Sequence, residues 1–397
     1  MTSAPEEEWQ LSTMDEAGTA PGDRSFRPDV EGLRAIAILL VVLFHSGLRV
    51  DQGGFIGVDV FFVISGFVIT GLLLRERASG SRTNFLSFYA KRAKRILPAA
   101  VLMIALVVIA TALINGRNDA VLAASDGRWS VLFLANVHFA SVSPNLFSTR
   151  PVVLAQLWTL SVEEQFYLVY PALFSLFMAA FLPWCPRRRL VIGLCIISAT
   201  SFAVSVKSSH MGIVGISEYP LTRGWEFALG GLVAIGTPIW KAMPPCLAAL
   251  TSWVGIIMIL CAASMYSFRL DYPGYAAALP VLGCALAIVG GTAQPPWGLE
   301  FLLGRWVFRW LGKFSYSWYL WHWPILVIAA EYFHTPEANS LTRNLVLVTL
   351  SLLIAVGSYF WVENPLRHSR WLAEHPHSVL VGAALLIGSC VALTYAF

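Results

Sequence analysis

The sequence predicts an all-α polytopic membrane protein. Hydrophobic residues make up 57% of the 397 residues and charged residues 13%, about half of the charged share of a typical soluble domain. The mean hydropathy is +0.67, and apolar runs near the length of a membrane-spanning helix recur along the chain. The 15 tryptophans and 12 tyrosines also suit a bilayer, because both rings favour the headgroup level.

Eleven apolar runs are long enough to cross the hydrocarbon core, which takes about 20 residues in a helix. They lie at 33–50, 56–74, 96–115, 160–182, 188–206, 219–236, 247–266, 276–292, 313–333, 341–362 and 378–396. Segment 128–140 is too short to span, so we expect it to be re-entrant or interfacial. The polar, acidic residues 1–28 predict a disordered cytoplasmic tail.

The basic residues predict the orientation, because lysine and arginine accumulate on the cytoplasmic side. With a cytoplasmic N-terminus, 19 of the 27 basic residues fall on that side and 8 fall outside. Counting 128–140 as a span would instead place Arg187, Arg188 and Arg189 outside. The charge bias therefore favours eleven spans, with an extracytoplasmic C-terminus.

The first span carries two ionisable residues, Arg34 and His45, within LRAIAILLVVLFHSG. Ionisable residues within spans are costly and therefore candidates for function. Eleven residues of helix return to the same face and cover about 16 Å, so the two side chains are expected to form a polar stripe facing a cavity. A snorkelling arginine and a hydrogen-bonded interfacial histidine are the alternative.

Three carboxylates are expected near the outer face, at about the depth of His45. Asp59 follows a short hairpin, and Glu163 and Glu164 open the fourth span. A histidine acting as general base needs an orienting acid, which Asp59 or Glu163 would supply. Adjacent helical residues point in different directions, so at most one of the two glutamates faces His45. A helix N-cap or an ion pair with Arg49 is the alternative role for Asp59.

A basic cluster, FYAKRAKRILP, follows the second span and contains Lys91, Arg92 and Arg95. The simple interpretation is a topogenic positive-inside cluster. The functional interpretation is a phosphate site at a cytoplasmic helix terminus. The ninth span adds Tyr316 and His322, two hydrogen-bonding residues in an aromatic segment. For most residues of this segment, aromatic packing is the alternative to a role in the site.

The sequence lacks the motifs of several other kinds of catalytic or binding site. The six cysteines stand singly, without the spacing of a disulfide framework or a zinc site, and no metal is expected. The glycines of GGFIGVDVFF follow no strand and precede no GK[ST], so they do not form a nucleotide-binding loop. No GxSxG or HExxH occurs. Arg223 and Glu226 are spaced for a structural salt bridge.

Six segments together resemble one family. They are FRPDVEGLRAIAILLVVLFHSG, GGFIGVDVFFVISGFVIT, FYAKRAKRILPA, LWTLSVEEQFYLVYP, FSYSWYLWHWPI and YFWVENPLRHS, between residues 26 and 369. In this order they closely resemble the bacterial membrane-bound acyltransferase family 3, the O-acetyltransferase-like group.

The resemblance implies a ten-helix acyltransferase bundle over 29–370 and an additional transmembrane helix over 371–397. It implies an enzyme of the bacterial plasma membrane that moves an acyl group, usually acetyl, from cytoplasmic acyl-CoA to a hydroxyl of an extracytoplasmic glycan or lipid-linked saccharide. The family's signature residues fall on Arg34, His45, Arg92 and Arg95. Some members continue into an SGNH-type domain, which this sequence lacks; whether the chain is a fragment stays open.

These observations predict a mechanism. Arg34, Lys91, Arg92 and Arg95 would bind the phosphates of acetyl-CoA, and His45 would deprotonate the acceptor hydroxyl. Glu164, Tyr316 and His322 are expected to contact substrate. An acyl-histidine relay is a variant, and a transporter or flippase of a lipid-linked glycan is the alternative function. Apart from substrates and membrane lipids no partner is expected, and no nucleic acid. The acceptor sugar, the acyl chain and the oligomeric state stay open.

Overall fold

The computed structural model describes residues 26–48, 52–80, 84–142, 152–179, 185–212, 215, 219–267, 270–333 and 340–397. Most of the predicted tail at 1–28 therefore lies outside the described residues, as do the ends of the expected spans at 49–50 and 180–182. Within the described ranges every regular element is helical. The predicted all-α fold class is confirmed.

Eleven of the described helices fall on the eleven expected spans. They are α2 (Pro28–His45), α3 (Gly57–Ala78), α4 (Phe85–Ile114), α7 (Leu157–Ala179), α8 (Pro186–His210), α9 (Pro220–Trp240), α10 (Pro245–Met265), α11 (Ala278–Thr292), α13 (Trp306–Tyr332), α14 (Leu341–Ser358) and α17 (Pro376–Thr394). Short elements join or extend them: η2 (Gly54–Ile56), α12 (Leu299–Leu303), the π-helical turn η5 (Tyr359–Glu363), α15 (Asn364–His368) and α16 (Arg370–Glu374).

Six helices among the described residues are long and apolar enough to cross a membrane. They are Gly54–Ala78, Phe85–Ile114, Pro186–His210, Pro245–Met265, Leu341–His368 and Pro376–Thr394. The other candidates are less apolar or shorter; α11, for example, has 15 residues. The chain is a multi-pass membrane protein, and the count of eleven spans stays a prediction.

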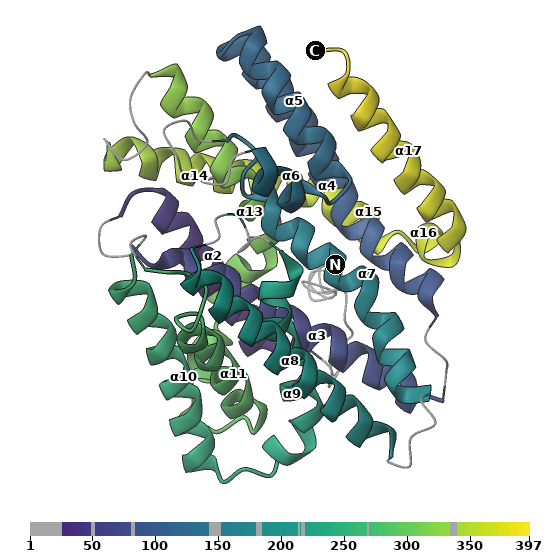
Figure 1. The fold of residues 1–397 in the computed structure, drawn as a ribbon, viewed down its shortest axis with the longest axis vertical. Helices are drawn as coiled ribbons and strands as arrows, with labels where there is room; N and C mark the ends of the chain where they lie inside the picture. Colours follow the sequence, from purple (N-terminus) through teal and green to yellow (C-terminus); the bar gives the residue numbers. More distant parts are fainter. Residues whose placement is uncertain are drawn as a thin grey trace, which may run out of the picture.

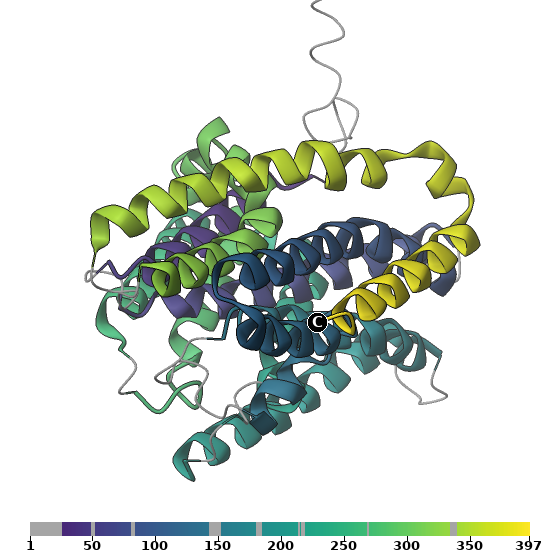
Figure 2. The same ribbon diagram turned by 90° about the horizontal axis from the view of Figure 1, so that it is seen from above.

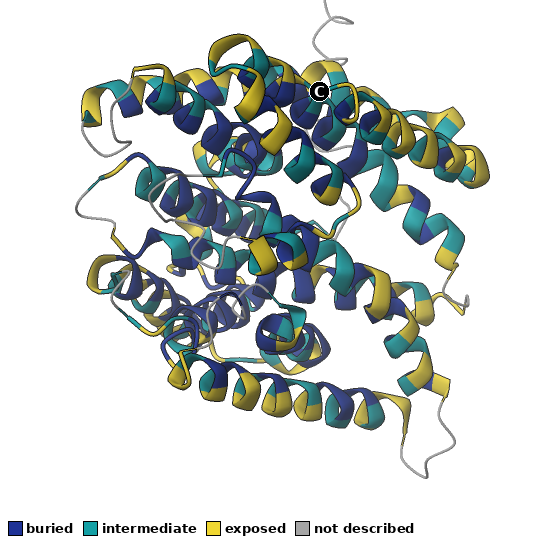
Figure 3. Cartoon of the chain, turned by 45° about the horizontal axis from the view of Figure 1, so that its top comes forward, coloured by how far each residue is buried: buried dark blue, intermediate teal, exposed yellow. Residues whose placement is uncertain are grey.

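The helices present apolar side chains on their outer surfaces, as a lipid environment requires. Leu113 is 81% exposed, Met265 77% and Trp361 84%. Figure 3 shows exposed positions along the outer sides of the helices and buried positions toward the interior. Such extensive apolar exposure is unusual for a soluble monomer, so these surfaces are suited to contact lipid.

The segment expected to be re-entrant or interfacial belongs to two helices. Residues 128–131 end α5 (Arg117–Val131), and residues 135–140 belong to α6 (Ala135–Val142). Figures 1 and 2 show α5 beside α4 and α17. Arg128 donates to the Thr394 carbonyl at 2.8 Å, so α17 is attached to this part of the bundle by a polar contact as well.

Helix α2 packs between α3 and α13 with close backbone contacts. A Cβ added at Gly57 of α3 would lie 2.4 Å from the carbonyl oxygen of Ala37. One added at Gly312 of α13 would lie 2.0 Å from that of Glu31. Both distances are far below van der Waals contact, so only glycine permits these approaches.

Replacing Gly312 with alanine is expected to force α13 away from α2 and to destabilise the protein by about 1–3 kcal/mol. The thermal unfolding midpoint in detergent measures this effect. Gly382→Ala is a matched control, because a Cβ at Gly382 of α17 has no atom within 4 Å. Equal midpoints for the two variants would contradict the packing argument.

Candidate functional site

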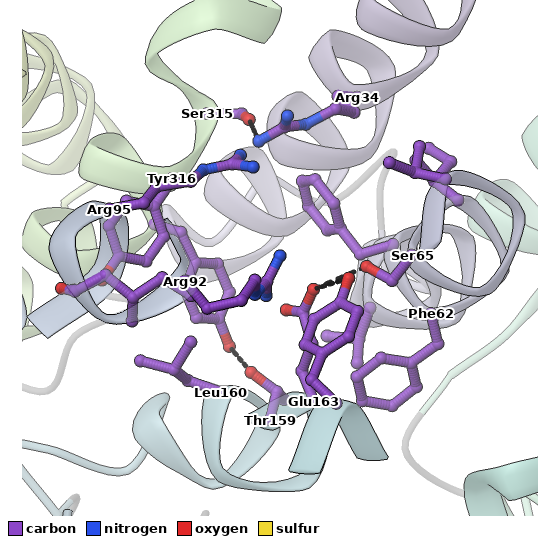
Figure 4. A pocket seen from close by; sticks show the side chains of 17 residues that line it. Arg34, Phe62, Ser65, Arg92, Arg95, Thr159, Leu160, Glu163, Ser315 and Tyr316 are labelled. Atoms are coloured by element: carbon purple, nitrogen blue, oxygen red, sulfur yellow. Dashed lines mark hydrogen bonds between the residues drawn. The ribbon is translucent and has the colours of Figure 1, made fainter. Parts of the chain in front are cut away.

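A cavity of about 110 Å³, lined by both apolar and charged side chains, lies between α2, α3, α4, α7 and α13. Figure 4 shows its lining, with arginine side chains from two helices directed toward the same space. The lining residues are Arg34, Val58, Phe61, Phe62, Ile64, Ser65, Val68, Arg92, Arg95, Ile96, Thr159, Leu160, Glu163, Tyr167, Ser315, Tyr316 and Tyr319. A volume of this size accommodates several water molecules.

Among the arginines that line the cavity, Arg34 and Arg95 have the fewest hydrogen bonds and ion pairs to other described residues. The Arg34 Nη2 donates one hydrogen bond to Ser315 Oγ at 2.9 Å. Arg95 also lines the cavity, and among the described residues no hydrogen bond or ion pair engages its guanidinium. A guanidinium has five N–H donors, so the two side chains together present unused donors and positive charge. This arrangement suits an anion such as a phosphate.

Arg92, by contrast, is already occupied. Its Nη2 donates to Glu164 Oε1 at 2.7 Å, and its guanidinium lies 3.5 Å from the centroid of the Tyr167 ring. Lys91 is exposed and does not line the cavity. The expected basic cluster therefore divides: Arg95 faces the cavity without an ion pair to any described residue, Arg92 is paired with Glu164, and Lys91 lies outside the cavity lining.

Glu163 lies deeper in the bundle than expected. Its Oε1 accepts hydrogen bonds from Ser65 Oγ at 2.6 Å and Tyr167 Oη at 3.0 Å, and it lines the same cavity as Arg34. The sequence placed it at the depth of His45 instead, which this structure contradicts.

A buried turn before α7 explains the difference. Gln156 donates to the Leu320 carbonyl at 3.1 Å, and Trp323 donates to the Val152 carbonyl at 2.8 Å. These bonds place the start of α7 beside the stretch of α13 that contains His322. Glu163 follows about two turns later, roughly 10 Å along the axis, and so reaches the level of Arg34.

His45 pairs with a second histidine. Its Nδ1 lies 3.1 Å from Nε2 of His322, and its ring centroid lies 4.6 Å from that of Trp323. His322 is fully buried, whereas His45 is partly exposed. The His45 ring thus contacts His322 of α13 and also bonds to the Val41 backbone one turn before it, while the sequence suggested a carboxylate as its partner.

Asp59 instead belongs to a buried ion-pair cluster between α3 and α9. Arg223 Nη1 donates to Asp59 Oδ1 at 2.8 Å and to Glu226 Oε1 at 3.1 Å. All three residues are at most 4% exposed. The expected Arg223–Glu226 pair is confirmed, and Asp59 joins it as a second carboxylate. This cluster connects two helices of the bundle rather than orienting His45.

Tyr319 connects the cavity with the histidine pair. It lines the cavity, and its ring centroid lies 5.4 Å from that of His322. Its hydroxyl bonds to Thr159 Oγ1 at 2.6 Å and donates to the Gln156 carbonyl at 2.8 Å. Tyr316 also lines the cavity and donates to the Ile96 carbonyl at 2.7 Å.

Five polar residues that line the cavity were not singled out from the sequence as site residues: Ser65, Thr159, Tyr167, Ser315 and Tyr319. A signal for two of them was present, because Ser315, Tyr319 and His322 are spaced i, i+4, i+7 and share one helical face. This face meets the Arg34–His45 face of α2, since Arg34 contacts Ser315 and His45 contacts His322. Ser65 and Thr159 carried no such pattern.

Comparison with known proteins identifies the family. Residues 27–362 match a family model described as an acyltransferase domain. The chain belongs to this family. The match includes every residue of the cavity and the histidine pair. No solved structure matches the chain.

Several curated proteins are similar to this acyltransferase-family chain. The peptidoglycan O-acetyltransferase OatA of Listeria monocytogenes is 30% identical over 368 residues, which cover 88% of this chain and 57% of OatA. YrhL of Bacillus subtilis (strain 168), provisionally named a peptidoglycan O-acetyltransferase, is 30% identical over 358 residues, covering 86% of this chain and 55% of YrhL. The chain spans little more than half the length of these relatives.

Proposed function

We propose that this protein is a membrane O-acyltransferase. It transfers an acyl group, acetyl in the simplest case, from cytoplasmic acyl-CoA to a hydroxyl of an extracytoplasmic carbohydrate. The observation that carries the proposal is the arrangement along α2, where Arg34 faces the cavity and a histidine pair follows at His45. The helix spans both residues without interruption, so about 16 Å separates them along its axis.

The donor would bind by its phosphates. Arg34 and Arg95 present guanidinium donors to the cavity, and charge-assisted hydrogen bonds from arginine to phosphate are among the strong ones. The separation between Arg34 and His45 is comparable to the length of an extended pantetheine arm. Tyr319, which touches both the cavity and His322, lies along this path. The thioester would then reach the neighbourhood of His45.

His45 would act as general base. It takes the proton from the acceptor hydroxyl while the hydroxyl oxygen forms a bond to the acyl carbonyl carbon. The carbon–sulfur bond then breaks, and the departing thiolate receives the proton from His45. The products are the acyl ester and the free CoA thiol, so atoms and protons balance. An acyl-histidine relay at His45 is the variant chemistry.

The acceptor is proposed from the relatives. OatA carries the name of a peptidoglycan O-acetyltransferase, which supports a cell-envelope glycan or a lipid-linked saccharide as acceptor here. The proposed orientation has a cytoplasmic N-terminus, so that the cavity faces the donor side and His45 lies nearer the acceptor side. In longer family members an SGNH-type domain would be a further partner in acyl delivery.

An assay with radiolabelled acetyl-CoA tests the proposal. Purified protein in liposomes receives labelled acetyl-CoA on one side and a glycan oligosaccharide on the other. We expect label in the oligosaccharide and an equal amount of free CoA, both lost in a His45→Gln variant. Movement of the glycan across the membrane without release of CoA would overturn the proposal and identify a transporter.

A further inference from the structure

We infer that His322 is a positioning residue that fixes the tautomer of His45 and so makes Nε2 of His45 the base. This inference rests on the proposed function, because it specifies how the ring of His45 is prepared for proton transfer. It follows from a chain of three hydrogen-bonding groups on α2 and α13.

The series of hydrogen bonds begins at two backbone carbonyls of α13. Nδ1 of His322 lies 2.8 Å from the Tyr319 oxygen and 3.2 Å from the Trp318 oxygen. A carbonyl oxygen only accepts hydrogen bonds, so Nδ1 carries a proton. In the neutral ring the lone pair of His322 is then on Nε2. The protonation state is thus assigned from the partners of the ring.

The next link is the contact between the two histidines. Nε2 of His322 lies 3.1 Å from Nδ1 of His45, and a hydrogen bond between two nitrogens requires one proton. Because the His322 nitrogen is an acceptor, Nδ1 of His45 donates. A neutral His45 therefore holds its lone pair on Nε2. The other tautomer would place two lone pairs opposite each other in a partly buried contact, which is unfavourable because neither nitrogen would then have a donor.

The surroundings of the two histidines explain why this series of hydrogen bonds would matter for catalysis. Asp59 is engaged by Arg223, and Glu163 by Ser65 and Tyr167. When Nε2 of His45 takes a proton, the Nδ1–H bond to His322 shares the new positive charge. The two carbonyl dipoles on the far side of His322 stabilise this charge. They do for His45 what a buried carboxylate does in a hydrolase triad.

Two substitutions at His322 test the inference. His322→Met fills a similar volume but removes the acceptor nitrogen, whereas His322→Gln keeps an amide oxygen that can accept from His45. We expect kcat to fall about 100-fold or more in the methionine variant and less than about tenfold in the glutamine variant, since general-base catalysis contributes about 10²–10⁴-fold. KM for acetyl-CoA should stay within twofold in both, because Arg34 and Arg95 are unchanged.

A spectroscopic measurement on the unmodified protein avoids any folding defect of the variants. Nitrogen-15 NMR of histidine-labelled protein, assigned by His45→Gln, is expected to show His45 protonated at Nδ1 and unprotonated at Nε2. A proton on Nε2, or equal kcat values for the methionine variant and the unsubstituted protein, would overturn the role of His322. Activity retained in His45→Gln would instead overturn the proposed function itself.

Discussion

Replacing His45 with glutamine is expected to lower kcat for acetyl transfer by about 10²–10⁴-fold. Glutamine keeps a polar side chain of similar length, so the packing of α2 against α13 should survive, but it cannot accept the proton of a hydroxyl at neutral pH. Initial rates with labelled acetyl-CoA measure the loss. The thermal unfolding midpoint is measured in parallel to separate a chemical defect from misfolding.

His375→Gln is the matched control for this variant. His375 is exposed at the start of α17 and bonds to the Trp371 carbonyl at 2.9 Å, away from the cavity lining. We expect its activity to equal that of the unsubstituted protein. A His45 variant that retained full activity would rule out His45 as the base and as an acyl carrier.

Arg95→Ala is expected to raise KM for acetyl-CoA by about 10- to 100-fold and to leave kcat within a few-fold. A hydrogen bond to a charged group contributes about 1.5–3 kcal/mol, and about 1.4 kcal/mol corresponds to a factor of ten in binding. KM reports this binding when release of the donor is faster than chemistry. Steady-state kinetics over a range of acetyl-CoA concentrations measures the change.

Lys91→Ala provides the comparison within the same basic cluster. Lys91 lies one turn before Arg95 on α4 but is exposed and does not line the cavity. It should leave KM within twofold. Equal increases in KM for the two variants would mean that the cluster acts through its general positive charge, and the assignment of Arg95 to a specific phosphate contact would be wrong.

The helical arrangement could be predicted from the sequence because lipid imposes a simple rule. Apolar runs near 20 residues locate the helices; α2 overlaps the expected 33–50 span, although it begins and ends five residues earlier. The helical repeat also placed Arg34 and His45 on one face, and the structure brings both into contact with α13. Such local regularities need no knowledge of neighbouring helices.

The contacts within the site could not be predicted in this way, because they join distant segments. His45 and His322 are separated by 277 residues. The level of Glu163 depends on the buried turn at 152–156, whose bonds to α13 have no sequence signature. Likewise, Arg92 and Arg95 look equivalent along the chain, and only Glu164 on α7 distinguishes them.

The close packing of α2 against α3 and α13 bears on how the two substrates would meet. Its backbone approaches α3 at Gly57 and α13 at Gly312 with no side chain between, so the three helices are tightly packed at these points. The arginine and the histidine lie on the same uninterrupted helix. On the proposed function, the donor phosphates and the acceptor hydroxyl would therefore reach two points of one helix, about 16 Å apart along its axis, each arriving from its own side of the membrane.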